Sequence, residues 1–179
     1  MCSKAFRGLY NIRQIRKHLS AESTKYLIHA FVTSHLDYCN ALLYKLPQYQ
    51  YDRLQKVLNA AARVTCLIPK VAHTTLLLRK LHWLPVKFRV EFKIALLVFK
   101  TLNGLAPQYL SELLVVKRSD SETLLVIPKV TRKTFGDRAF SHVGPTVWKA
   151  LQSSLRNCRN IDSFKVQLKT YLFKKAFNL

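Results

Sequence analysis

Apolar residues recur at the spacing of an α-helix through the first two thirds of the chain, and this pattern constrains the fold more than any other feature. It is cleanest over residues 51–66, where apolar and basic residues form two separate lines. The apolar line is Leu54, Val57, Leu58, Ala61 and Thr65, and the basic line is Arg53, Lys56 and Arg63. A repeat close to 3.6 residues places each line on its own face of a helix. The sequence therefore predicts an amphipathic helix at 51–66.

The same spacing predicts further helices over residues 4–18, 21–44, 86–103 and 107–114. Ser20 is a suitable N-cap for the second of them, and Gly104 is the expected left-handed stop after 86–103. In 4–18 a polar line lies opposite Ala5, Leu9, Ile12 and Leu19, and it consists of Arg7, Asn11, Gln14 and His18. Arg16 interrupts the apolar side of this helix.

The last third changes character after residues 117–123, a polar stretch that reads as a linker. We expect strands at 124–127 and 139–143, paired as a small hairpin at most, then helices starting at Pro145 and capped by Asp162. The predicted fold class is mainly α. A helical bundle occupies 1–70, a central helical segment 71–116 and a small α+β region 124–179.

Charge points to the class of partner. The 179 residues hold 30 Lys and Arg against 9 Asp and Glu, a formal net charge of +21. Such a chain attracts polyanions, with nucleic acid first and an anionic membrane surface second. No apolar run approaches the roughly 20 residues of a bilayer span, and the first residues lack the apolar core of a signal peptide. With four scattered cysteines, this favours an intracellular protein, nuclear or cytoplasmic, that is neither secreted nor embedded in a membrane.

Catalytic chemistry finds little support. Phosphoryl transfer requires clustered carboxylates for divalent ions, and the nine acids are dispersed. Four isolated glycines form no phosphate-binding loop. Cys66, His73 and His82 lack the pairing of a zinc site, and the adjacent Ser141 and His142 cannot act as a triad. We expect no enzyme activity, metal, cofactor or small-molecule substrate for the chain on its own.

Two basic lines are the candidate nucleic-acid contacts. Arg53, Lys56 and Arg63 form one, and Arg89, Lys93 and Lys100 form the other. The alternative is two solvated helix faces, but so few acids compensate them that phosphate contact is favoured. Tyr49 and Tyr51, beside the first line, are candidate stacking platforms. Phe88, Phe92, Phe99, Trp148 and Phe164 have core spacing and are expected to be buried.

Several stretches resemble the C-terminal part of reverse transcriptases of jockey-like non-LTR retrotransposons, the long interspersed elements. They are LIHAFVTSHLDYCNALLY (27–44), LQKVLNAAAR (54–63), LHWLPVKFRVEFK (81–93), LNGLAPQYL (102–110) and FGDRAFS (135–141). The stretch between residues 62 and 81 departs from the sequence pattern of this family.

This resemblance implies that residues 1–70 correspond to the polymerase thumb and the remainder to the region that follows it. The fingers and the palm, with its paired aspartates, are absent from the chain. The partners implied are RNA and DNA as a primer–template duplex, together with that palm and fingers. The resemblance also implies that the helix at 51–66, with Arg53, Lys56 and Arg63, is the counterpart of the thumb helix that contacts the duplex. Two alternatives stay open: a host-used basic helical module that binds nucleic acid, or a protein that binds anionic membranes or partner helices.

Overall fold

The structure, a computed structural model, is mainly helical and describes residues 2–69, 73–118, 123–129 and 136–179. The chain divides into two compact units. The first holds residues up to 40, residues 46–89 and residues 176–179, and the second holds residues 41–45 and 90–175.

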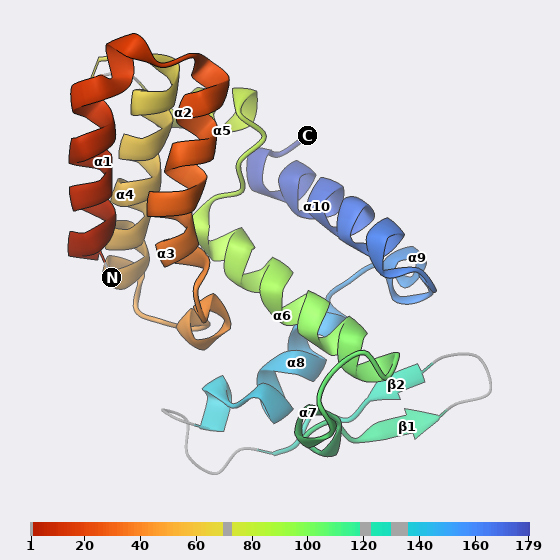
Figure 1. The fold of residues 1–179 in the computed structure, drawn as a ribbon. Helices are drawn as coiled ribbons and strands as arrows, with labels where there is room; N and C mark the ends of the chain where they lie inside the picture. The colour runs from red at the N-terminus through yellow and green to blue at the C-terminus, as the bar shows by residue number, and fades with distance from the viewer. Residues whose placement is uncertain (1, 70–72, 119–122, 130–135) are drawn as a thin grey trace. The chain divides into compact units, whose positions relative to one another are not determined.

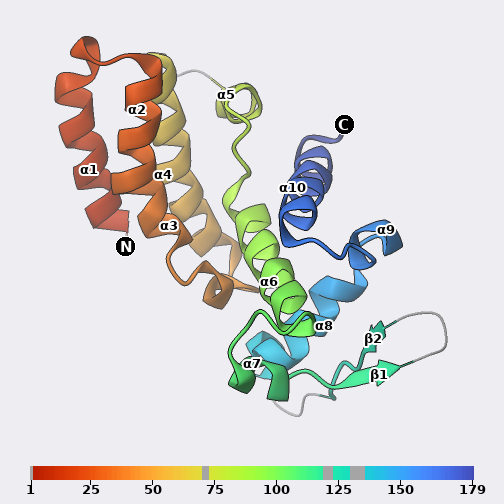
Figure 2. The ribbon, with the colours of Figure 1, turned by 45° about the vertical axis from the view of Figure 1, so that its right-hand side comes forward.

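The first unit is built on a helical bundle. Its elements are α1 (Cys2–Ile15), the 3₁₀ turn η1 (Arg16–His18), α2 (Ala21–Ile28), the π-helical turn η2 (His29–Thr33), α3 (Ser34–Asp37), α4 (Gln48–Cys66) and α5 (Thr74–Lys80). Helices α1, α2 and α4 lie side by side (Figures 1 and 2). Their apolar stripes meet in a core that includes Leu9, Ile28, Val32 and Leu58. The amphipathic helix expected at 51–66 is confirmed as α4, and it begins three residues earlier.

The continuous helix expected over 21–44 is wrong. The chain forms α2, widens into η2, and ends α3 at Asp37, because Cys39 adopts a left-handed φ of 49°. The Thr33 hydroxyl lies 2.8 Å from Nδ1 of His29, and the Ser34 hydroxyl donates to the carbonyl of Ala30. Such side-chain bonds to a preceding turn compete with regular helix and bend it.

The second unit holds the rest of the elements. They are the 3₁₀ turn η3 (Asn40–Leu43), most of α6 (Val86–Leu102), α7 (Gln108–Glu112), β1 (Val116–Arg118), β2 (Thr123–Leu125), the 3₁₀ turn η4 (Gly136–Arg138), α8 (Phe140–Lys149), α9 (Ser153–Arg156) and most of α10 (Ile161–Phe177). The core centres on Phe164, whose ring stacks on that of Phe99 with 4.2 Å between the ring centroids. The centroids of the Phe164 and Trp148 rings lie 5.9 Å apart. These three aromatics are buried as predicted, whereas Phe88 and Phe92 are only half-buried.

The predicted hairpin exists, but only one of its strands lies where it was expected: β2 overlaps the strand predicted at 124–127. β1 and β2 pair antiparallel with Val116 opposite Leu125, so residues 117 and 118, expected in a linker, form a strand (Figure 1). The strand predicted at 139–143 is wrong, because most of it belongs to α8. Gly144 lies within α8, and a Cβ there would lie 3.1 Å from a methyl of Val98, so glycine lets α8 pack closely on α6.

Helix ends follow local chemistry in most places. The Ser20 side chain accepts a hydrogen bond from the amide of Ser23, and Gly104 has φ of 68°, both as predicted. Pro145 does not start a helix but lies inside α8. The cap of α10 is Asn160 rather than Asp162, since Oδ1 of Asn160 accepts from the amides of Asp162 and Ser163. No helix within the described ranges has the length and hydropathy needed to cross a membrane.

Candidate nucleic-acid interface

Helix α4 presents the first basic line on its solvent face. Arg53 and Lys56 are exposed, and Arg63 is half-buried. Leu54 and Leu58, on the opposite face, are buried against the bundle. A rigid helix anchored in this way holds the two exposed cations about one turn apart, which is the arrangement that backbone phosphate contacts require.

The two tyrosines proposed for stacking differ in exposure. Tyr49 lies in the first turn of α4 with 61% of its surface exposed, so its ring is accessible. Tyr51 is 9% exposed and lines a pocket within the first unit. A base cannot stack on a ring that is already covered. The stacking role predicted for Tyr51 therefore does not fit the structure.

The second basic line, on α6, is not uniform. Arg89 donates from Nη1 to the carboxylate of Asp37 at 2.7 Å and from Nε to the carbonyl of Leu84 at 2.9 Å. Through these bonds its guanidinium joins parts of the first unit to one another, and it is not free to bind phosphate. Lys93 is exposed and Lys100 is half-buried, and both belong to the second unit.

The carboxylates of the described residues are largely occupied by other cations. Besides Asp37 with Arg89, the ion pairs are Asp137 with Lys45, Asp162 with Lys165, and Glu91 with Lys175. None of these four pairs includes Arg53 or Lys56. Asp52 is the acid nearest to them in sequence, and its Oδ1 accepts from Nε2 of Gln48 at 2.9 Å.

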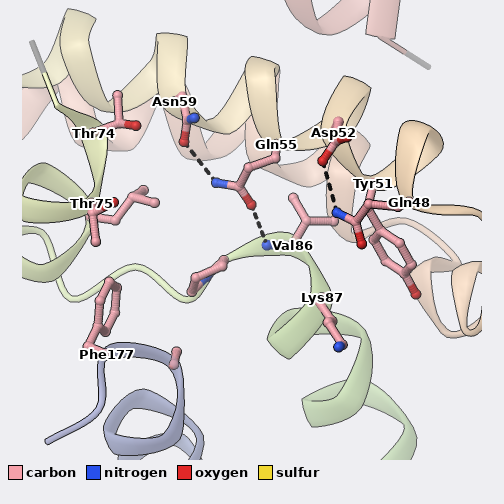
Figure 3. Close-up of a pocket in the computed structure, with 13 residues that line it drawn as sticks. Gln48, Tyr51, Asp52, Gln55, Asn59, Thr74, Thr75, Val86, Lys87 and Phe177 are labelled. Atoms are coloured by element: carbon pink, nitrogen blue, oxygen red, sulfur yellow. Dashed lines mark hydrogen bonds between the residues drawn. The ribbon is translucent and has the colours of Figure 1, made fainter.

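A pocket of about 320 Å³ lies in the first unit, between α4, α5 and the start of α6 (Figure 3). Gln55 spans it: Nε2 donates to Oδ1 of Asn59 at 2.8 Å, and Oε1 accepts from the amide of Val86 at 2.9 Å. Gln55 thus caps α6 and ties it to α4. Both the nitrogen and the oxygen of its side-chain amide are engaged in these hydrogen bonds. This cap was not predicted from the sequence.

A smaller pocket of about 120 Å³ in the second unit contains Tyr44, Glu91 and Lys175. Burial raises the pKa of the Tyr44 phenol above its ordinary value of 10.0, and the negative charge of Glu91 raises it further. This phenol is therefore a weaker acid than an exposed tyrosine.

Metal-binding groups are dispersed in the described part of the chain. No three His, Cys, Asp or Glu side chains gather there as a metal site would require. The four cysteines are all free thiols.

Helix α1 and the η1 turn that follows it carry a line of exposed residues that was not predicted from the sequence. Phe6, Tyr10, Arg13 and Lys17 are exposed at spacings of four, three and four. The spacing was readable in the sequence. Exposure was not, because an aromatic at helical spacing is more often part of a core.

Comparison of the chain with models of known protein families, with curated proteins and with solved structures finds no match.

Proposed function

We propose that this chain binds RNA and DNA through their backbone phosphates and catalyses no reaction by itself. The observation that carries the proposal is the exposed pair Arg53 and Lys56 on α4, in a chain of net charge +21. Neutralising phosphates releases condensed counterions, and this supplies affinity without sequence preference.

The proposal further assigns the chain to the thumb and downstream region of a non-LTR retrotransposon reverse transcriptase. This assignment rests on the five stretches quoted above. The genomic sequence immediately before the codon for Met1 tests it. A palm-encoding stretch there, intact or decayed, supports the assignment, and an unrelated sequence contradicts it.

Salt dependence tests the binding. Affinity for a DNA duplex and for an RNA–DNA duplex is measured by fluorescence anisotropy over a range of salt concentrations. Arg53→Ala combined with Lys56→Ala should flatten the slope of log K against log salt by up to about 1.8, since each phosphate contact contributes about 0.9. Helix content should be preserved, because alanine is the best helix former. Unrelated sequences should lose affinity equally.

Three controls sharpen the result. Lys169→Ala with Lys174→Ala removes the same charge from exposed positions of α10 and should change the slope less. Asp52→Asn should tighten binding, because Asp52 precedes Lys56 by one turn of α4 and repels phosphate. If Lys93→Ala with Lys100→Ala flattens the slope while the α4 pair does not, the interface has been placed on the wrong helix. If all three pairs act equally, the charge acts diffusely and the α4 site is refuted.

Absence of catalysis is tested by primer extension on a primed RNA template with Mg²⁺ or Mn²⁺. We expect no extension, since the chain has too few clustered acids to hold two metal ions. Extension that disappears when an Asp of this chain is replaced would contradict the proposal.

A further inference from the structure

The exposed line, hereafter the α1 stripe, consists of Phe6, Tyr10 and Arg13 of α1 and Lys17 of the η1 turn that follows it. The ring-bearing residues Phe6 and Tyr10 are 45% and 64% exposed, and Arg13 and Lys17 are also exposed. Each member follows a buried residue by one position, the buried set being Ala5, Leu9, Ile12 and Arg16. One residue turns an α-helix by about 100°, so the stripe stands beside the core-facing line rather than within it.

Packing of the neighbouring turn leaves the stripe uncovered. A Cβ on Gly8 would lie 2.9 Å from the carbonyl oxygen of Phe31, so η2 closes the Gly8 side of α1. Phe6 and Tyr10 are each two residues from Gly8, which places them on roughly the opposite side of the helix. Their rings therefore face away from η2.

Charge around the stripe selects an anionic ligand. Residues 2–18 contain Lys4, Arg7, Arg13, Arg16 and Lys17 and no Asp or Glu. Arg16 is buried, and the other four are exposed. Helix α1 packs on α4, so the stripe and the pair Arg53 and Lys56 lie on neighbouring helices of one unit (Figure 2).

Exposed aromatic rings beside arginine and lysine match the chemistry of unpaired nucleotides. Bases stack on such rings whatever their sequence, and cations between the rings hold the phosphates. A duplex cannot use the rings, because its base faces are covered by neighbours. Phe6 and Tyr10 are about 6 Å apart along the helix axis, wider than the ~3.4 Å between stacked bases of one strand. The stripe therefore fits splayed, unpaired bases.

We propose that the α1 stripe binds single-stranded nucleic acid, with bases stacked on Phe6 and Tyr10 and phosphates held by Arg13 and Lys17. This deepens the proposed nucleic-acid binding and rests on it. It adds a site for an unpaired strand on the helix that packs against α4.

The test compares a mixed-sequence single-stranded oligonucleotide with a blunt duplex, using the full chain. Phe6→Leu with Tyr10→Leu keeps apolar bulk but removes both ring faces. The Kd for the single strand should rise at least about tenfold, given about 1–3 kcal/mol per stacked base, while the Kd for the duplex changes by less than about twofold. Phe6→Tyr with Tyr10→Phe should restore single-strand affinity. Tyr26→Leu with Tyr38→Leu, which removes two rings that are 70% and 73% exposed, is the matched control and should leave it unchanged.

The outcomes separate the two proposals. Unchanged single-strand affinity in the Leu pair, with duplex binding that still depends on Arg53 and Lys56, overturns the stripe and leaves the proposed function standing. Absence of binding to any nucleic acid overturns both. Equal losses of affinity for the single strand and for the duplex in the Leu pair overturn the proposed role of the stripe. The role is also overturned if the Leu pair loses self-association, or binding to phosphatidylserine vesicles, while its affinity for the single strand stays unchanged.

Circular dichroism establishes whether the Leu pair folds. If this variant does not fold, the unaltered chain is instead crosslinked by ultraviolet light to a bromouridine oligonucleotide. Crosslinks at Phe6 or Tyr10 support the proposal, and crosslinks confined to other residues overturn it.

Discussion

Arg16 donates a hydrogen bond from Nε to the main-chain carbonyl of Val64 at 2.9 Å. Its Nη2 donates to the carbonyl of Thr65 at 2.9 Å and its Nη1 to that of Leu19 at 2.7 Å. Val64 and Thr65 lie in the last turn of α4, where carbonyls lack intrahelical partners and the helix dipole is negative. A buried arginine thus binds the end of α4 and joins it to η1, the turn that directly follows α1.

Arg16→Ala should lower the free energy of unfolding by about 2–4 kcal/mol, because it removes three hydrogen bonds from a charged side chain to main-chain carbonyls, two of them buried. Urea denaturation followed by circular dichroism measures this. Arg7→Ala, at an exposed position of the preceding helix α1, should change stability by less than about 0.5 kcal/mol. A similar effect of the two substitutions would show that the Arg16 bonds contribute little.

Arg89 is predicted to stabilise the fold rather than to bind phosphate. Arg89→Ala should cost about 1–3 kcal/mol, since it breaks the bonds to Leu84 and Asp37. The salt slope of duplex binding should not change. Lys93→Ala, one turn further along α6, should leave stability within about 0.5 kcal/mol. A stable Arg89→Ala variant with a flatter slope would restore Arg89 to the interface.

Gly8→Ala should destabilise the first unit. The added methyl would meet the backbone of Phe31 at 2.9 Å, and a helix backbone yields less readily than a side chain. We expect a loss of about 1–3 kcal/mol from overpacking, offset by up to about 1 kcal/mol of helix propensity. Asn11→Ala, at an exposed position of α1, provides the comparison in thermal unfolding. A net gain in stability for Gly8→Ala would show that α1 and η2 are not in such close contact.

Tyr44 should make stability fall at alkaline pH. Its raised pKa means that the folded state favours the neutral phenol. The resulting stabilisation is complete below the ordinary pKa of about 10 and is lost as pH rises through the folded-state pKa. Unfolding free energies measured on either side of pH 10 should therefore decline less steeply in Tyr44→Phe.

Glu91→Gln distinguishes the two causes of this shift. It removes the nearby negative charge but leaves the phenol buried. Phenolate absorbance, taken as the difference between chains with and without Tyr44, should show a pKa that moves down towards its ordinary value. An unchanged pKa would mean that burial alone accounts for the shift.

The sequence predicted those elements that short-range chemistry fixes. Helices α4 and α6 follow from apolar spacing over more than four turns, and the Ser20 cap and the Gly104 stop depend only on neighbouring backbone groups. The predominance of helix followed in the same way.

Elements in the last third depended on distant contacts. Residues 140–143 have a short apolar pattern that suits either a strand or a helix. The structure forms the helix, in which Gly144 packs closely on Val98 of α6. Likewise, β2 overlaps the strand predicted at 124–127, but its partner β1 includes residues 117 and 118 of the predicted linker.

Tertiary structure decided which of the predicted site residues are exposed and which are bonded to other parts of the fold. Arg53 and Arg89 look alike in sequence, since each is a cation on the polar side of an amphipathic helix. The structure leaves Arg53 exposed and binds Arg89 to Asp37, which is 52 residues away. Periodicity determined which side of a helix each residue occupies. Exposure and hydrogen-bond partners required the packed chain, because they depend on which other helix lies against that side.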